Sequence, residues 1–315
     1  MKAAILEEFG KIEVCEIKDL EAKEGFSVIK VIEATLNPID IFTIMGRRTV
    51  KPIPHIPGVE VYGEVVEGKY KGKKVVVYPR IFCGECEYCF SGREMLCTGE
   101  LFGVSTNGGF AELCLVPDKN IFPIEEKVLP EVASSLPVGA LTSYHALKYA
   151  NFGDRVAVIG ATGNTGIFSV QIAKLKGCEV FAWSRKKANW LKEFGADEVL
   201  NYESVEKFIG YFDIVIDPLG EKTFDRSIKL IKKGGTFITF GILTGGTVSL
   251  NIFDLYSKEI KIIGTTGGSR KEFSELISIS EKLKTKVWKK IKLDDLKSAI
   301  EEMGKKEGVI KVMVA

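Results

Sequence analysis

The sequence contains very little histidine and glutamine, and it has no long apolar run. Histidine occurs only at His55 and His145, and glutamine only at Gln171, among 315 residues. Two histidines limit the imidazole ligands and general bases that any site can use. No run of about 18 uncharged apolar residues occurs, so we expect no membrane-spanning helix. Acidic residues follow Lys2 within a few positions, so we expect no secretory signal and a cytoplasmic location.

An excess of charge of one sign is also absent. The chain has 44 Lys and Arg against 42 Asp and Glu, a formal net charge of +2. Nucleic acids and acidic membranes bind concentrated basic surface, so we predict neither as a partner and expect a small-molecule substrate. The length allows two domains of ordinary size, each with its own core.

The first part of the chain has the pattern of a β domain. Residues 1–124 carry short runs of alternating apolar residues between glycines and prolines, which predict a barrel-like arrangement of strands. The predicted strands lie at 2–6, 27–34, 63–66, 74–78 and 111–116.

Residues 125–266 instead alternate the patterns of buried strands and helices. This order predicts parallel strands joined by right-handed crossovers, and therefore an α/β fold with a doubly wound parallel sheet. Residues 267–315 have a helical pattern followed by a final apolar run. Strands are predicted at 155–159, 179–183, 213–217 and 236–240, and helices at 167–176 and 187–194; the final apolar run is 309–314.

A glycine-spaced turn joins the predicted strand 155–159 to the helix after it. Small residues let the backbone approach a pyrophosphate, and a helix N-terminus offers unpaired N–H groups and a favourable dipole. The strand before and the helix after are the context that a dinucleotide-binding turn needs; the alternative is a tight packing turn. The expected cofactor-binding residues of this turn are Gly160, Ala161, Thr162, Gly163, Asn164, Thr165 and Gly166.

The end of the next predicted strand distinguishes NAD from NADP. NAD sites usually place a carboxylate there, which accepts hydrogen bonds from the ribose. This chain instead has Ser184, Arg185 and Lys186, whose hydroxyl and cations suit a 2′-phosphate. The alternative is that these residues form the solvated start of the next helix. The predicted cofactor is therefore NADP(H).

Four of the seven cysteines fall in one short segment, at Cys83, Cys86, Cys89 and Cys97. A large cytoplasmic chain seldom carries a disulfide framework, so this cluster indicates a metal. Four thiolates close a tetrahedron around zinc and leave no open position. We therefore predict one structural zinc per chain. An iron–sulfur cluster also uses thiolates, but the last gap is longer than in the bacterial ferredoxin motif.

The cysteine lobe, the glycine turn and their order resemble the medium-chain dehydrogenase/reductase superfamily, the zinc-type alcohol dehydrogenase-like proteins, over essentially the whole chain. The resemblance implies a GroES-like catalytic domain (1–124) with a structural zinc lobe (83–97), a Rossmann cofactor domain (125–266) and a C-terminal return to the catalytic domain (267–315). It also implies a homodimer or homotetramer, with residues 247–263 suited to the contact between subunits.

Zinc-dependent members of that family have a catalytic Cys shortly before an Asp, and a Gly-His-Glu later in the chain. Here Asn37, in Asn-Pro-Ile-Asp40, replaces the Cys, and Val59 replaces the His before Glu60. Neither replacement supplies a thiolate or an imidazole, so we expect no catalytic zinc unless His55 provides a ligand. The Asn-Pro-Ile-Asp segment is similar to the zinc-free branch, the quinone oxidoreductases and acryloyl-CoA reductases, although many quinone reductases lack the cysteine lobe.

The resemblance implies further cofactor-binding residues, each with a packing role as its alternative. A residue beside the adenosine phosphate and four near the nicotinamide half are expected: Tyr202, and then Thr142, Phe240, Gly241 and Thr265.

These features together predict hydride transfer from NADPH to the β-carbon of an enone or an enoyl thioester such as acryloyl-CoA, or to a quinone. Such an acceptor has its own conjugated carbonyl, so a metal Lewis acid is not indispensable. The expected catalytic residues are Asn37, donating to the enolate oxygen or the ribose, Asp40, orienting its neighbours, and Tyr62, contacting the substrate. Two alternatives stay open: a zinc-dependent alcohol dehydrogenase with relocated ligands, and a non-catalytic NADPH-binding protein.

Overall fold

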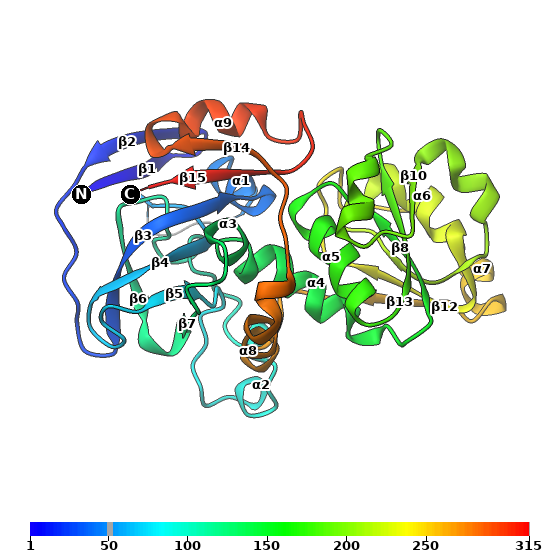
Figure 1. Cartoon of the computed structure of the whole chain (residues 1–315), viewed down its shortest axis with the longest axis horizontal. Helices are drawn as coiled ribbons and strands as arrows, with labels where there is room; N and C mark the ends of the chain where they lie inside the picture. The colour runs from blue at the N-terminus through cyan, green and yellow to red at the C-terminus, as the bar shows by residue number, and fades with distance from the viewer. Residues whose placement is uncertain (49–52, 315) are drawn as a thin grey trace. The chain divides into compact units, whose positions relative to one another are not determined.

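The computed structural model describes residues 1–48 and 53–314, and the chain forms two compact units (Figure 1). The first unit joins Met1–Leu141 to Gly267–Ala315, and the second is Thr142–Thr266. The sequence predicted the first boundary at residue 124, but the chain enters the second unit only after Leu141.

The stretch 125–141 belongs to the first unit for a physical reason. The backbone N–H groups of Val138 and Gly139 donate to the Glu60 carboxylate at 2.7 and 2.8 Å. Glu60 starts a strand of the first unit and is fully buried. A buried carboxylate needs such donors, so this stretch is tied to the strand that it satisfies.

The first unit is built on a seven-stranded sheet in the order β14-β15-β3-β4-β5-β7, with β6 also paired to β3, and on a separate β1-β2 pair. All its strand pairs are antiparallel except β14-β15. The strands are β1 (Lys2–Glu8), β2 (Lys11–Glu16), β3 (Phe26–Leu36), β4 (Glu60–Glu67), β5 (Lys74–Val77), β6 (Leu113–Pro117), β7 (Ile121–Pro123), β14 (Val287–Lys292) and β15 (Val309–Met313). Its helices are α1 (Pro38–Ile44), α2 (Glu87–Phe90), α3 (Pro130–Ala133), α8 (Arg270–Ile279) and α9 (Leu296–Glu302).

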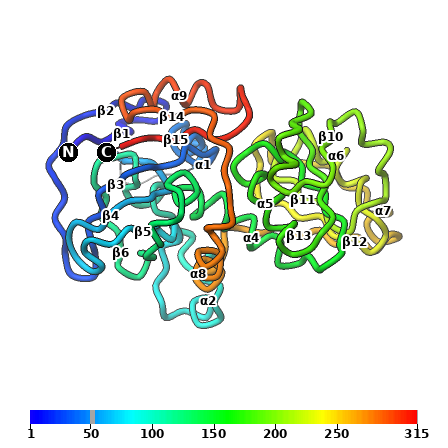
Figure 2. Tube along the Cα trace, viewed as in Figure 1, coloured from blue at the N-terminus to red at the C-terminus, as the bar shows by residue number. Residues whose placement is uncertain are grey.

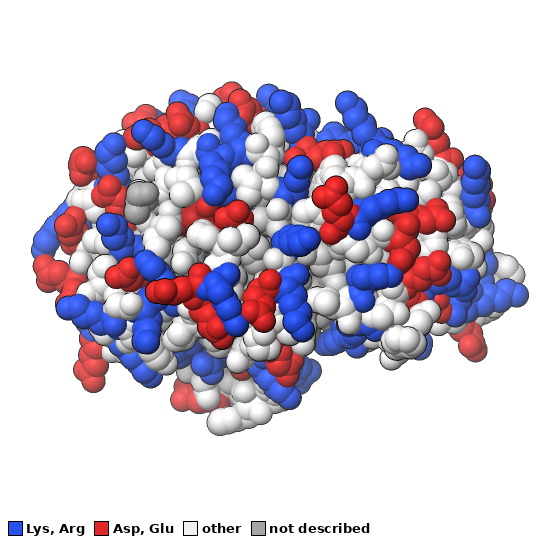
Figure 3. Space-filling view, viewed as in Figure 1, with Lys and Arg blue, Asp and Glu red and all other residues white. Residues whose placement is uncertain are grey.

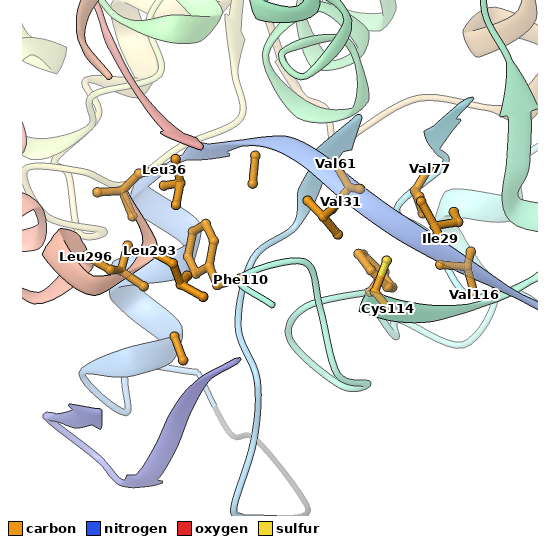
Figure 4. Close-up of a cluster of buried hydrophobic side chains, with 14 of the residues drawn as sticks. Ile29, Val31, Leu36, Val61, Val77, Phe110, Cys114, Val116, Leu293 and Leu296 are labelled. Atoms are coloured by element: carbon orange, nitrogen blue, oxygen red, sulfur yellow. The ribbon is translucent and has the colours of Figure 1, made fainter. Parts of the chain in front are cut away.

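The core of the first unit lies where strands from both ends of the chain meet (Figure 4). Val31 and Val61 come from neighbouring strands, and Phe110 lies between them and the C-terminal Leu293 and Leu296. All five are buried. Burying apolar area is the dominant favourable contribution to folding, so the C-terminal segment is an integral part of this unit.

The second unit is a parallel α/β sheet of six strands in the order β10-β9-β8-β11-β12-β13, which confirms the predicted doubly wound fold. Its strands are β8 (Arg155–Ile159), β9 (Glu179–Ser184), β10 (Glu198–Asn201), β11 (Phe212–Ile216), β12 (Ile231–Thr239) and β13 (Lys261–Gly264). Its helices are α5 (Asn164–Leu175), α6 (Glu221–Ser227) and α7 (Ile252–Ser257), with α4 (Leu141–Ala146) leading in. The helix predicted at 187–194 is a 3₁₀ segment, Asn189–Phe194.

Figure 2 traces the same path along the chain, from the N-terminal strands through the parallel sheet and back to β15. On the face drawn in Figure 3, basic and acidic side chains are interspersed, as expected from the nearly balanced charge. No helix among the described residues combines the length and apolar character needed to cross a membrane.

Candidate active site, cofactor turn and metal centre

The four clustered cysteines come together in a short lobe around α2. Their sulfur atoms all lie within 4.8 Å of one another. Cys83 Sγ lies 3.4 Å from Cys97 Sγ and 3.9 Å from Cys89 Sγ, and the sulfurs of Cys86 and Cys89 are 3.6 Å apart. Sulfurs bound tetrahedrally to zinc at about 2.3 Å lie roughly 3.8 Å from each other. The four side chains therefore fit one zinc ion.

Backbone N–H groups support the same lobe. Cys83 N donates to the sulfur of Cys97 at 3.3 Å, and Gly84 N donates to the sulfur of Cys89 at 3.3 Å. Such bonds stabilise thiolates and orient them as ligands. With four sulfurs the ion has no open position, so this centre suits a structural role.

The predicted catalytic residues Asn37 and Asp40 lie at the start of α1 and are buried. Asp40 accepts a hydrogen bond from the Asn37 backbone N–H at 2.8 Å and another from the Val59 N–H at 3.1 Å. The Asn37 amide donates to Glu60 Oε2 at 2.7 Å and to the Thr35 carbonyl at 3.3 Å. Both N–H bonds of this amide are thus used within the protein, whereas the sequence predicted a donor to the substrate or cofactor.

Burial dominates the electrostatics of the two carboxyl groups. It raises the pKa of Asp40 to about 7, against the N–H donors of Asn37 and Val59, which lower it. Burial likewise raises the pKa of Glu60, and the positive charge of Lys311 is the largest effect opposing the rise. These two acids therefore titrate above the usual carboxyl range.

The residues that could serve as alternative ligands for a catalytic zinc do not form a common ligand group. His55 is buried, and its Nε2 lies 3.2 Å from the Gly103 carbonyl oxygen. The oxygens of Asp40 and Glu60 accept from N–H donors, as described above. Within residues 1–48 and 53–314, the cysteine lobe is the one group of three or more His, Cys, Asp or Glu close enough to share an ion. This donor set does not fit a second zinc.

Tyr62 lies two residues beyond Glu60 on β4 and is largely buried. Its register partner on β3 is Glu33, whereas Glu60 pairs with Thr35. Side chains two residues apart share a face of a strand, so Tyr62 lies on the face of Glu60 but two register pairs further along the strands.

In the second unit, the glycine turn lies between β8 and α5, as predicted. Gly160 has φ +70°, in the left-handed region that favours glycine. A Cβ on Gly166 would lie 2.3 Å from the Gly160 carbonyl oxygen, so the turn closes only with glycine there. The N-cap residue of α5 is Gly163, which has no side chain to cap the helix. The first N–H groups and the dipole of α5 therefore suit a phosphate group.

The residues predicted to determine the preference for NADP over NAD lie at the carboxyl end of β9. Arg185 and Lys186 are exposed, while Ser184 is buried and donates its hydroxyl to the Lys186 carbonyl. Burial raises the pKa of Tyr202 to about 12, and the groups that act on this phenol include the Gly160 backbone N–H and the cations Arg185 and Arg226. The phenol thus lies near the glycine turn and two arginines, and Arg226 on α6 was not predicted from the sequence.

Most of the other predicted cofactor residues lie at the carboxyl ends of the strands of this sheet, and Thr142 lies on the helix that precedes it. Thr265 follows β13, and its N–H donates to the Thr239 carbonyl at the end of β12, directly before Phe240 and Gly241. The Thr265 hydroxyl oxygen is buried without a hydrogen-bond partner among the described residues. A buried orphan hydroxyl at the carboxyl ends of parallel strands fits a bound dinucleotide. Thr142, on α4, is largely buried.

Both units of the chain resemble known proteins in sequence, and the whole chain resembles a solved structure. The family model for the alcohol dehydrogenase GroES-like domain matches residues 23–126, and the model for zinc-binding dehydrogenases matches residues 164–282. The NAD-dependent alcohol dehydrogenase of Sulfolobus acidocaldarius is 32% identical over 99% of this chain and 100% of its own. The acryloyl-coenzyme A reductase of Metallosphaera sedula is 28% identical over 96% of both chains. The cobalt- and zinc-bound thermostable alcohol dehydrogenase of Pyrobaculum aerophilum has a TM-score of 0.94 and 37% identity over 99% of both chains.

Proposed function

Because the chain belongs to the medium-chain dehydrogenase/reductase superfamily, as a zinc-type alcohol dehydrogenase-like member, we propose that it is an NADPH-dependent reductase of activated carbon–carbon double bonds or quinones. The observation that carries this proposal is the hydrogen bonding of Asn37. Its amide is held by Glu60 and Thr35, at the position where a metal-dependent relative has a thiolate. An acceptor with its own conjugated carbonyl needs no Lewis acid at that position.

The glycine turn, the uncapped α5 and the orphan Thr265 hydroxyl would hold the dinucleotide, which supplies the hydride when bound. The positive charges of Arg185 and Arg226, both acting on Tyr202, favour the additional phosphate of NADPH over NADH. The absence of a carboxylate after β9 supports the same preference.

In the first unit, Asp40 and Glu60 fix the start of α1 and the side chain of Asn37. The Asn37 amide is therefore held in one orientation before substrate arrives. Because both of its N–H bonds are used within the protein, Asn37 shapes the site rather than donating to the charge that develops during the reaction. A proton from solvent completes the reduction.

An alcohol dehydrogenase acting on alcohols and simple carbonyls is the second candidate. It is favoured by the relatives from Sulfolobus acidocaldarius and Pyrobaculum aerophilum, which carry that activity in their names. A zinc-dependent enzyme of this type would hold two zinc ions per chain.

A screen of NADPH and NADH oxidation separates these candidates. The acceptors are a benzoquinone, a cyclic enone, acryloyl-CoA and benzaldehyde, and zinc is counted by mass spectrometry on unchelated protein. We expect NADPH-dependent turnover of at least one activated alkene or quinone and one zinc per chain. Aldehyde turnover alone, with two zinc ions, would support the second candidate. NADPH binding without turnover of any acceptor would indicate a non-catalytic protein.

The same assay tests the cofactor preference. Replacing Arg185 with Ala removes one cation near Tyr202 and should raise the KM for NADPH about tenfold, the loss expected from one charge-assisted bond. The KM for NADH should change little. Lys192→Ala, in the 3₁₀ segment that follows, is the matched control. Equal effects of Arg185→Ala on the two cofactors would contradict the assignment.

A further inference from the structure

One lysine of the first unit is completely buried. Lys311 lies on β15 opposite Thr35 of β3 and has no exposed surface. Its ammonium donates to Thr35 Oγ1 at 2.6 Å, to Ser134 Oγ at 2.8 Å and to Ser135 Oγ. An ammonium has three N–H donors and no acceptor, so these three hydroxyls use all of them.

Two of these hydroxyl groups donate their own hydrogen bonds to other acceptors. Thr35 Oγ1 donates to the Ser134 carbonyl at 2.6 Å, and Ser134 Oγ donates to Glu33 Oε1 at 2.7 Å. Both oxygens therefore face Lys311 as acceptors, which suits a charged lysine. A buried charge is tolerated only where such partners compensate for lost hydration.

Carboxylates surround this ammonium on several elements. Glu33 is linked to it through Ser134, and Glu60 lies on the other side of Thr35, its register partner. Glu131 on α3 also attracts the ammonium, and the half-exposed Lys290 on β14 repels it. Successive register partners across an antiparallel sheet share one face, so Lys311, Thr35 and Glu60 lie in a row.

We propose that Lys311 is a positioning residue: its ammonium is the internal cation that keeps Glu60 ionised, and Glu60 in turn holds the Asn37 amide. The role rests on the proposed function only in that Asn37 belongs to the proposed reaction site. A protonated Glu60 would lose acceptor capacity toward the three N–H donors of Asn37, Val138 and Gly139.

Lys311 carries its charge only below a certain pH. Burial lowers the pKa of Lys311 to about 8, while Glu33, Glu60 and Glu131 oppose the fall. The ammonium is therefore charged at neutral pH and loses its proton as the pH rises through about 8.

Infrared difference spectroscopy tests this role without any substrate. A protonated carboxyl group has a carbonyl stretch that a carboxylate lacks. At pH 7 the difference between the unmodified protein and Glu60→Gln should show no such band for Glu60. Lys311→Met should gain a band of one carboxyl group per chain, and Lys311→Met/Glu60→Gln should lose it again.

Lys290→Met is the control. Lys290 is the register partner of Lys311 on the neighbouring strand β14, and its ammonium lies 3.6 Å from Glu33, but its side chain is half exposed. This variant should leave the Glu60 signal unchanged. A protonated Glu60 in the unmodified protein, a comparison that needs no lysine variant to fold, would overturn the proposal. So would a Lys311→Met protein that shows no new band. Turnover is not measured, so a failure here leaves the proposed reduction standing, and a failed substrate screen leaves this role standing.

Discussion

Asp40 combines full burial with hydrogen bonds to two backbone N–H groups. Its folded-state pKa of about 7 lies above the ordinary value of 3.8, so the folded protein binds this proton more tightly than the unfolded chain. The stability that this contributes is complete below the ordinary value and is lost as the pH rises through about 7.

Replacing Asp40 with Asn removes the titrating group. We expect the free energy of unfolding, measured in urea between pH 4 and pH 7, to fall with a slope smaller by up to about 1.4 kcal/mol per pH unit, the value for one proton. Asp254→Asn, at a half-exposed ion pair with Lys258, is the control and should keep the original slope. An unchanged slope in Asp40→Asn would show that Asp40 is ionised throughout this range.

At this scale the sequence predicted part of the site. Asn37 and Asp40 stand out because the segment Asn-Pro-Ile-Asp resembles the zinc-free branch of the family, and the structure places them at the N-cap and within the first turn of α1. Lys311 was missed because its contact with Thr35 depends on the pairing of two strands from opposite ends of the chain. Its one local signal is a single lysine within the apolar run Val309–Val314.

Among the elements, the turn from β8 into α5 requires glycine at position 166 but not at position 163. Gly166 packs against the Gly160 carbonyl, whereas a Cβ on Gly163 would find its nearest atom at 3.6 Å, which is ordinary contact. Gly163 also has φ −85°, which any residue adopts.

This difference yields a paired prediction. Gly166→Ala should destabilise the protein by about 2–3 kcal/mol, as overpacking does, whereas Gly163→Ala should change stability by less than about 0.5 kcal/mol. If the turn holds a pyrophosphate, Gly163→Ala should still weaken NADPH binding, because the added methyl group stands where the ligand approaches. Urea unfolding and fluorescence titration measure the two effects. Equal stability losses in both variants would contradict the packing argument.

Strands such as β1, β3, β8 and β9, and the helix α5, were predictable because their apolar residues form an alternating pattern or a continuous run within the element. The strands β2, β7, β10, β13 and β14 were not predicted. The 3₁₀ form of Asn189–Phe194 and the π-helical turn Leu136–Ala140 were not predicted either. Their backbone form depends on tertiary contacts, such as the donation of Val138 and Gly139 to Glu60, which a local pattern does not contain.

For the molecule as a whole, exposed apolar side chains gather in one part of the second unit. They lie in the segment that leads into the edge strand β13 of the parallel sheet and in β13 itself. Unpaired edge strands and exposed apolar patches both favour association, so we propose that two copies of the chain pair here. The exposed residues are Ile242, Leu243, Val248, Ile252, Phe253, Tyr256 and Ile262.

Light scattering after gel filtration tests this pairing. We expect the mass of a dimer or tetramer for the unmodified chain, and a smaller species for Phe253→Glu/Tyr256→Glu, because two buried carboxylates would face the apolar contact. Phe152→Glu is the control, since Phe152 is an exposed aromatic residue of the same unit outside the patch. A monomer for the unmodified chain, or an unchanged mass for the double variant, would rule the contact out.

The pairing of β15 with β3 also sets the order in which the protein can be completed on the ribosome. Residues 142–266 are translated between these partners, which at about 5–20 residues per second takes on the order of ten seconds or more. During that time the edge of β3 has no β15 beside it, and Glu33 and Glu60 have no ammonium from that strand. The parallel sheet therefore has time to fold first, and the nascent N-terminal part must be kept from pairing with the wrong strand until its partner emerges.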